Sequence, residues 1–179
     1  RGRRLSVLLL EPYLAGSHEA WARGYRDASL HDVRLIGLPG RFWKWRMHGA
    51  AVTLARAIES SQIRPDVVLA TDMLDLAAFL GLARRGLAGA AVALYMHENQ
   101  LAYPPPRPDP GWSPSRRRRA ERSDAHYPFV NLTSALAADL VLWNSAHNRD
   151  SFLDGLPRFL RSFPDYREHT VVDEVWRRS

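Results

Sequence analysis

The sequence predicts an α/β protein with a Rossmann-like, doubly wound parallel sheet. Continuous apolar runs, of which Leu5–Leu10 is the first, are typical of parallel strands that helices cover on both faces. Such runs alternate five times with helix-like segments along the 179 residues, which indicates a parallel sheet. Polar residues, among them Asp72, follow the runs directly. They mark the edge at which open α/β sheets bind ligands.

Turn and capping residues divide the chain into elements. The first apolar run ends at Glu11-Pro12, and Ser17 is the expected N-cap of the helix that follows. Pro39-Gly40 ends the second strand, and the turn at residues 64–66 precedes the third. The expected strands are residues 5–10, 32–38, 67–70, 91–96 and 139–143, and the expected helices are residues 18–29, 49–61, 74–84, 127–137 and 146–161.

The length and the apolar fraction of 46% fit one globular domain with its own core. We expect residues 1–165 to form this domain. Residues 166–179 are predicted to be a tail or the start of a linker to a C-terminal domain. The proline- and arginine-rich segment 104–124 is predicted to be a mobile loop.

The absence of cysteine excludes disulfides and thiolate metal sites, as fits a cytoplasmic protein. The opening apolar run stops at Glu11 and lacks a small-residue cleavage site, so it is interpreted as a strand and not as a signal peptide. The net charge is +6, and all basic residues except Lys44 are arginine. This charge favours polyanionic partners such as nucleic acid or nucleotide phosphates, although a basic surface without such a partner has the same composition.

The turn Ala15-Gly16-Ser17-His18 joins the first strand to the first helix. A small-residue turn lets backbone N–H groups and a helix N-terminus face a phosphate. The stretch is neither a G-x-G-x-x-G motif nor a P-loop. A tight turn capped by Ser17 is the alternative.

Four polar side chains, His97-Glu98-Asn99-Gln100, follow the fourth strand. They donate and accept hydrogen bonds, as sugar hydroxyls require. Adjacent side chains of an extended segment alternate in direction, so not all four can face one ligand. The alternative is a hydrogen-bonded loop that closes the sheet edge. We expect no metal site, because neither H-E-x-x-H nor a second close histidine is present.

Two stretches could meet nucleic acid. Phe42-Trp43-Lys44-Trp45-Arg46 mixes aromatic planes with cations, which stack on bases or sugars and meet phosphates, unless the tryptophans pack on the domain. Arg116–Arg119 could contact an RNA backbone or form a solvated run. Asn131 lies in the middle of a predicted helix, and we expect it on an exposed face.

Several of these stretches, taken in register, resemble one family. Together they are similar to the N-terminal domain of the tRNA-queuosine α-mannosyltransferases, from about Leu5 to Asp165. Some relatives have a Gly-Gly pair where this chain has Ala15-Gly16, and segment 104–124 is longer than expected. The motifs that carry the resemblance are EPYLAGSH at 11–18, WKWR at 43–46, HENQL at 97–101 with Tyr103-Pro104, and Ala138-Asp139 leading to Asn144-Ser145.

The resemblance implies a GT-B fold of which this chain is the N-terminal, acceptor-side half. It implies transfer of mannose from GDP-mannose to queuosine in tRNA, with retention and without a cofactor. Most of the donor would bind to a second domain, so the isolated chain would be inactive. Front-face attack, in which the leaving diphosphate helps to deprotonate the acceptor, leaves the protein to orient the substrates and stabilise charge.

The resemblance also implies roles for single residues. Gly16 and Ser17 would lie near the diphosphate. His97 and Glu98 would be the catalytic residues, His97 positioning the sugar or acting as acid or base, and Glu98 not serving as nucleophile. The other implied substrate-binding residues are His18, Asn99, Gln100, Asn144, Ser145 and Asn148, and Trp43, Lys44, Trp45 and Arg46 would bind the nucleic acid.

Two other functions stay open at this point. The same fold could glycosylate a small-molecule or lipid acceptor. Alternatively, the chain could be a non-catalytic RNA-binding module that uses the tryptophans and the arginine run. The tetrad favours catalysis, because an RNA-binding module needs no His-Glu-Asn-Gln after a buried strand.

Overall fold

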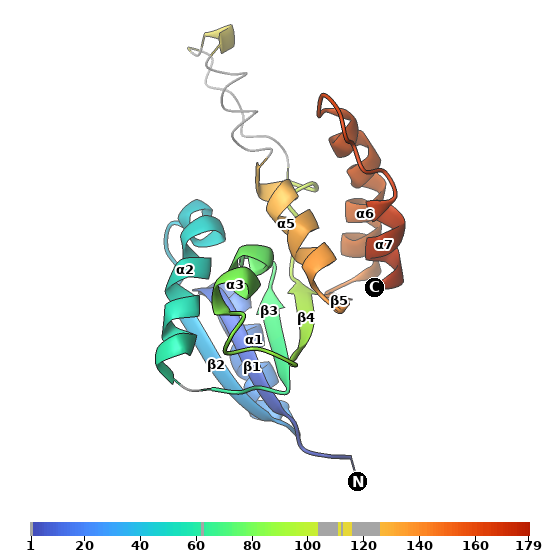
Figure 1. Ribbon diagram of the computed structural model, residues 1–179. Coiled ribbons are helices and arrows are strands. Elements are labelled where there is room, and N and C mark those ends of the chain that lie inside the picture. Colours follow the sequence, from blue (N-terminus) through green and yellow to red (C-terminus); the bar gives the residue numbers. More distant parts are fainter. Residues whose placement is uncertain (1, 62, 104–110, 112, 116–125) are drawn as a thin grey trace.

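The computed structural model describes residues 2–61, 63–103, 111, 113–115 and 126–179 (Figure 1). Most of the predicted mobile loop 104–124 and the arginine run 116–119 lie outside the described residues. None of the described helices is long and apolar enough to cross a membrane.

A five-stranded parallel sheet forms the centre of the domain, as predicted. Its spatial order is β2-β1-β3-β4-β5. The chain therefore adds β2 on one side of β1 and β3 on the other, which makes the gap between β1 and β3 the topological switch point. The strands are β1 (Ser6–Leu14), β2 (Asp32–Pro39), β3 (Val67–Thr71), β4 (Ala91–Met96) and β5 (Leu140–Trp143).

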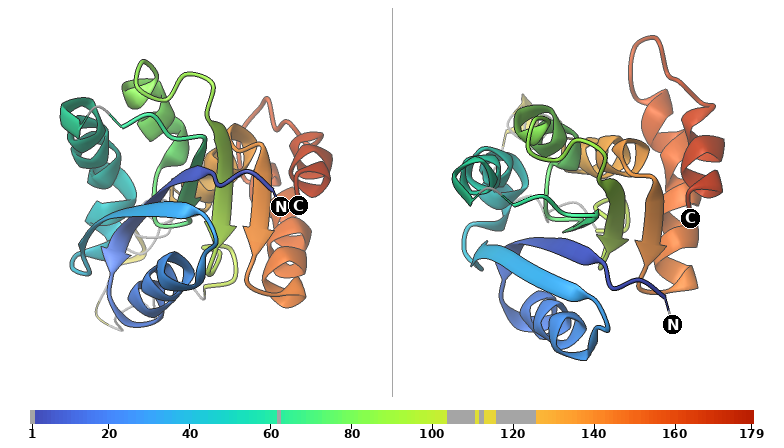
Figure 2. Two further views of the ribbon diagram at one scale, coloured as in Figure 1. Left: turned by 90° about the horizontal axis from the view of Figure 1, so that it is seen from below. Right: turned by 60° about the horizontal axis from the view of Figure 1, so that its bottom comes forward.

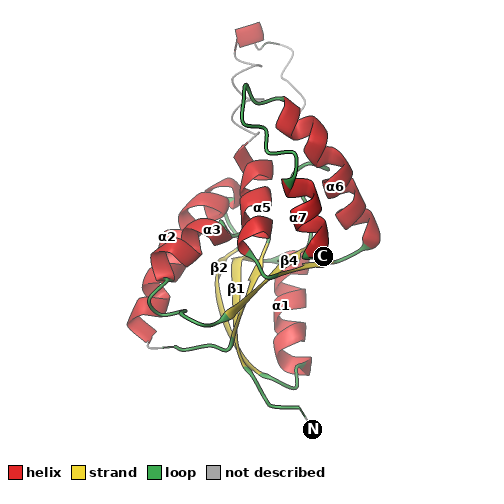
Figure 3. Ribbon diagram, turned by 45° about the vertical axis from the view of Figure 1, so that its right-hand side comes forward, coloured by secondary structure: helices red, strands yellow, loops and turns green. Residues whose placement is uncertain are grey.

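Helices cover both faces of the sheet (Figures 2 and 3). Because side chains alternate along β1, Val7 and Leu9 pack with α1, whereas Leu8 and Leu10 enter the larger core on the other face. That core includes Phe79 of α3 and residues of the remaining helices. The helices are α1 (Gly16–Ala28), α2 (Trp43–Ser61), α3 (Leu76–Ala83), α5 (His126–Ala137), α6 (Ala146–Arg161) and α7 (Val171–Arg177).

The helix expected at residue 49 begins six residues earlier, so the aromatic stretch expected to be a loop is the first turns of α2. Phe42 has a φ of 54°, and its carbonyl accepts from the backbone N–H groups of Trp45 and Arg46. Aromatic residues are mediocre helix formers. Tertiary packing overrides this preference, because Met47 is fully buried and the Trp43 ring lies against Tyr127.

Two smaller expectations at the first strand were also wrong. β1 continues to Leu14, so Glu11 lies inside the strand and pairs in register with Gly37 of β2. α1 begins at Gly16, and its N-cap is Ala15, which makes no side-chain capping bond. Ser17 is therefore not the cap, because the chain already turns at Gly16, whose φ is +56°.

Residues 166–179, expected to be a tail, include the short helix α7. Its Val175 is fully buried in the larger core, which we call the main core and which contains Leu8, Leu10 and Phe79. The backbone N–H of Val141 in β5 donates to the carbonyl of Arg178 at 2.7 Å, and the Trp143 indole donates to the Ser179 hydroxyl. Both contacts tie this segment to the edge strand of the sheet.

Candidate functional site

A cleft of about 400 Å³ opens at the C-terminal edge of the sheet. The start of α1 contributes Gly16, Ser17 and His18, and the loop after β4 contributes Glu98 and Gln100. A second hollow of about 370 Å³ adjoins it, because Glu98 and Tyr103 line both. The second hollow is also lined by His97, Asn99, Asn144, Ser145 and Asn148. The structure thus gathers the sequence-predicted substrate residues in two neighbouring hollows.

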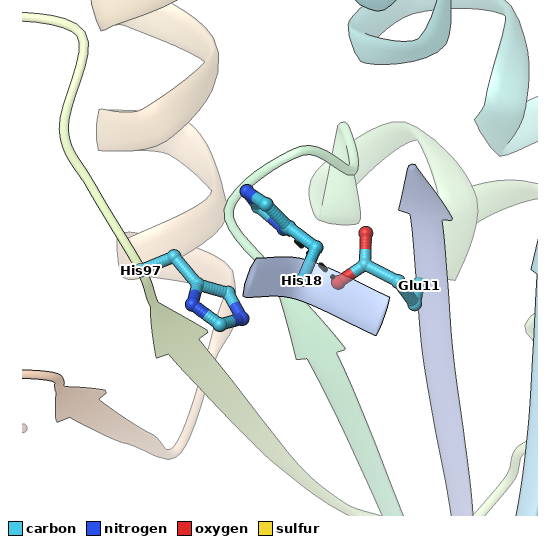
Figure 4. A group of neighbouring side chains, drawn as sticks. All are labelled: Glu11, His18 and His97. Carbon is cyan, nitrogen blue, oxygen red and sulfur yellow. Dashed lines mark hydrogen bonds and ion pairs between the residues drawn. The ribbon is translucent and has the colours of Figure 1, made fainter. Parts of the chain in front are cut away.

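Glu11, His18 and His97 meet between β1, α1 and the end of β4 (Figure 4). Glu11 is fully buried, and its Oε2 lies 3.2 Å from Nδ1 of His18. Its Oε1 accepts from the backbone N–H of Tyr13 at 2.8 Å. The rings of His18 and His97 are 4.2 Å apart between centroids. Glu11 had no assigned role in the sequence, because only the fold shows that its side chain lies beside a histidine seven residues later.

The pKa values of the His18 and His97 imidazoles are shifted in opposite directions. Burial works to lower the pKa of His18, but the hydrogen bond and the charge of Glu11, helped by the charge of Glu98, outweigh it, so this pKa is raised. Burial and the charge of His18 lower the pKa of His97 to about 4. At neutral pH His97 is therefore uncharged, and His18 is the imidazole that holds a proton more readily.

Aromatic side chains fix the ring of His97. The rings of Trp21 and Tyr95 stack with 4.0 Å between their centroids. Both meet the His97 ring edge-on, with centroid distances of 5.1 Å for Trp21 and 4.8 Å for Tyr95. The backbone N–H of His97 donates to Oδ1 of Asp72 at 2.9 Å. Burial raises the pKa of Asp72 to about 8. Among the described residues, no group hydrogen-bonds to Nε2 of His97 or to Oδ2 of Asp72.

The tetrad after β4 divides between two directions, as alternation of side chains requires. Glu98 accepts from the Tyr103 hydroxyl at 2.7 Å, which, with burial, raises the pKa of Tyr103 to about 12. Asn99 is buried and points inward, where its amide donates to Oδ1 of Asn148 at 2.7 Å and its Oδ1 accepts from Ala102. Asn99 therefore anchors the loop, while Glu98 and Gln100 line the cleft.

The polar start of α6 supports the same loop. The Asn144 side chain donates to the His97 carbonyl, and the Asn148 amide donates to the Met96 carbonyl at 2.9 Å. Ser145 caps α6 by accepting from the backbone N–H of Asn148. These side chains hold the end of β4 against α6 and also border the second hollow.

The expectation that Asn131 lies on an exposed face was wrong. Asn131 is fully buried, and its amide donates to the Asp72 carbonyl at 3.0 Å. Its Oδ1 accepts from the backbone N–H of Gln100 at 2.9 Å. Asn131 therefore lies on the buried side of α5, and its side chain links the loops after β3 and β4.

Asn131→Ala is expected to lower the free energy of unfolding by about 2–3 kcal/mol, because it leaves the Asp72 carbonyl and the Gln100 N–H buried without this partner. Urea denaturation measures the change. Thr133→Ala is the matched control in the same helix, since its hydroxyl bonds only carbonyls of its own helix, and it should cost about 0.5 kcal/mol or less. Equal losses in both variants would contradict the role of Asn131.

The aromatic and cationic stretch forms one rim of the cleft. Trp43 lines the cleft and lies 5.2 Å from Tyr127, and Lys44 lies within about 5.5 Å of both rings. Trp45 is exposed and lies against Gly49 of its own helix. The Arg46 guanidinium donates to the Pro39 carbonyl. Trp43 therefore lines the cleft, Lys44 lies beside the rings of Trp43 and Tyr127, and Trp45 and Arg46 lie farther along the helix.

Glu11, His18 and His97 are also the described residues that could hold a metal ion, since their ligand atoms lie within 4.8 Å of one another. Along the sequence no second histidine lies close to His97. The fold brings His18 beside His97 and so provides one. Nδ1 of His18 is, however, already hydrogen-bonded to Glu11.

The protein is thus a parallel α/β domain whose cleft, at the switch point of the sheet, lies between the glycine turn at the start of α1 and the polar loop after β4. The family profile for the tRNA-queuosine alpha-mannosyltransferase N-terminal domain matches residues 6–179. The chain belongs to this family, as its motifs indicated. It is 33% identical over 170 residues to the tRNA-queuosine alpha-mannosyltransferase of Drosophila melanogaster. The alignment covers 94% of this chain and 41% of that relative, so the chain spans about two fifths of its length.

Proposed function

We propose that this chain is the acceptor-side domain of a retaining glycosyltransferase that transfers mannose from GDP-mannose to queuosine in cytoplasmic tRNA. The observation that carries the proposal is the family match over residues 6–179, together with a cleft at the sheet edge lined by the family-like motifs. The relative is named for this modification. Glycosyl transfer exchanges one C–O bond for another without net electron transfer, so the proposal invokes no cofactor.

The donor diphosphate is assigned to the turn at Gly16 and Ser17. Gly16 has a φ of +56°, and among the described residues outside its immediate chain neighbours no atom lies within 4 Å of the Cβ position that another residue would occupy. The backbone angle therefore favours glycine here, and the open side leaves room for a ligand at the N-terminus of α1. The remainder of the donor is assigned to a further domain, since the relative is more than twice as long as the matched region. Without that domain the chain should have no turnover.

The transferred sugar is assigned to the loop after β4. His97 and Glu98 are the proposed catalytic residues: a neutral His97 donates or accepts at a sugar hydroxyl, and Glu98 contributes charge. Gln100 lies on the same side of the loop, within the cleft. Asn99 and Asn148 position the loop through their mutual hydrogen bond, and Asn144 does so through the His97 carbonyl.

The tRNA is assigned to the rim formed by the start of α2. Trp43 offers a stacking surface beside Tyr127, and Lys44 and Arg46 supply positive charge. The net charge of +6 favours the same partner.

The activity is tested with the complete gene product that contains this chain, purified and incubated with labelled GDP-mannose. We expect label in queuosine-bearing tRNA and none in tRNA that carries guanosine at the same position. Label in a small-molecule or lipid acceptor, with tRNA unlabelled, would show a different acceptor class. Binding of tRNA without transfer to any acceptor would show an RNA-binding module.

Trp43→Ala is expected to weaken tRNA binding by about 5- to 150-fold, because one stacked base contributes roughly 1–3 kcal/mol. Fluorescence anisotropy with labelled tRNA measures the affinity. The matched control is Trp176→Ala, which removes an exposed tryptophan of α7. Equal affinities for the Trp43 variant and the unmodified chain would remove this rim from the RNA interface.

A further inference from the structure

Glycosyl transfer to a hydroxyl group requires a place for the acceptor proton. The donor C–O bond breaks, the acceptor oxygen bonds to the anomeric carbon, and the O–H proton must leave. We propose that His18 takes this proton and that Glu11 positions and charges it for this task. The inference rests on the proposed glycosyl transfer and assigns the base within that same cleft.

Only one of the two ring nitrogens of His18 faces Glu11, which leaves the other, Nε2, for the acceptor. Its Nδ1 faces the buried carboxylate of Glu11 at 3.2 Å, and the other oxygen of that carboxylate is held by the Tyr13 N–H. The Nδ1–H tautomer is therefore favoured in the neutral ring, which leaves the lone pair on Nε2. Figure 4 shows Nε2 pointing away from Glu11, and the His18 side chain lines the cleft. A carboxylate that orients an imidazole in this way is the arrangement of hydrolase triads.

His97 is unsuited to the same task. Its ring lies 4.2 Å from that of His18, so a proton on one imidazole disfavours a proton on the other. Burial and this neighbour lower the pKa of His97 to about 4, which makes it a weak base. The two histidines therefore divide the work: His97 binds the sugar as a neutral group, and His18 carries the proton.

The charged surroundings favour a proton on His18. Glu11 from β1 and Glu98 from the loop after β4 are charged, and they raise the pKa of His18 despite its burial. The Tyr13 ring meets His18 edge-on, with 6.0 Å between the ring centroids. The titratable groups around His18 are Glu11 and Tyr13 from β1, Asp72 after β3, and His97 and Glu98 after β4.

The step balances without a further reactant. As the acceptor oxygen bonds to the anomeric carbon, its proton moves to Nε2 of His18. The electrons of the broken donor bond leave with the nucleotide diphosphate. The imidazolium of His18, still paired with Glu11, then returns its proton to the departing diphosphate or to water.

The charge arrangement is tested on the 179-residue chain by NMR titration of its histidine side chains. We expect His18 to titrate above 6.5 and His97 far below it. Glu11→Gln should lower the pKa of His18, because it removes the carboxylate that favours the proton. An unchanged His18 titration in this variant, or His97 titrating above His18, would overturn the proposal.

The proton transfer is tested on the complete gene product. A base must be unprotonated, so kcat/KM should rise with pH through the raised pKa of His18. Glu11→Gln should move this rise to lower pH and lower its plateau, and Glu11→Asp should restore part of the rate. His18→Gln should reduce kcat by about 10²–10⁴-fold. The control is His31→Gln, at the opposite end of the sheet beside Leu5, which should leave kcat and the pH profile unchanged.

The outcomes separate this inference from the proposed function. If the unmodified protein transfers no mannose to any queuosine-bearing tRNA, the proposed function fails. If the unmodified protein does transfer mannose, and the His18→Gln variant keeps kcat within about threefold of it, the assignment of His18 as the base is wrong. Tight 1:1 binding of Zn²⁺ that is lost in each of the variants Glu11→Gln, His18→Gln and His97→Ala would also overturn it, because the three residues would then be metal ligands.

Discussion

His97→Ala should reduce mannose transfer by the complete gene product by about 10²–10³-fold, while the fold is retained. The physical reason is the loss of a hydrogen-bonding group that Trp21, Tyr95 and Asp72 hold in one orientation. The His97 side chain is half-buried, and its Nε2 makes no hydrogen bond to another described residue, so the alanine variant breaks no such bond. Its removal should therefore affect the reaction more than the stability.

The measurement is kcat/KM with queuosine-bearing tRNA, accompanied by a urea denaturation curve. His31→Ala, at the opposite end of the sheet, is the control and should retain activity. Unchanged turnover in the His97 variant would remove this residue from the site. A collapse of stability in the same variant would show that the ring serves the fold instead.

Val175→Asp is expected to destabilise the chain by about 4 kcal/mol or more, because it places a carboxylate without a partner in the main core. Thermal unfolding monitored by circular dichroism should show a large fall in Tm. The neighbouring change Trp176→Asp is the control, since that side chain is 54% exposed, and it should have a much smaller effect. Similar losses in both would contradict the conclusion that α7 is integral to this domain.

The regular parts of the fold could be predicted because their signals are local. β4 and α6 have the bounds that apolar runs and capping residues predicted, Ala91–Met96 and Ala146–Arg161. α2 differs because its start is decided by contacts from elsewhere, above all Trp43 on Tyr127. α7 was not expected because its apolar residues, Val171, Val172, Val175 and Trp176, stand in a polar segment, and only the fold shows that the three valines pack on the core.

The position of the cleft was predicted to the level of the loops that line it. Polar residues after parallel strands meet at one edge, so the turn at Gly16 and the loop at His97 were expected to be neighbours. Sequence spacing could not show that Glu11 faces His18, since that contact depends on β1 continuing past residue 10 and on where α1 begins. Nor could it show that Asn131 links two loops, since a mid-helix asparagine carries no signal of burial.

The bond between the Val141 N–H and the Arg178 carbonyl has a consequence for self-association. β5 is the last strand on its side of the sheet, and an exposed strand of this kind invites pairing with another molecule. Here the Arg178 carbonyl accepts a hydrogen bond from the outward-facing amide of Val141. The Ser179 hydroxyl accepts one from the indole of Trp143. Loss of α7 would therefore expose part of the core and also the backbone edge of β5. The exposed edge would favour aggregation through pairing with strands of other molecules.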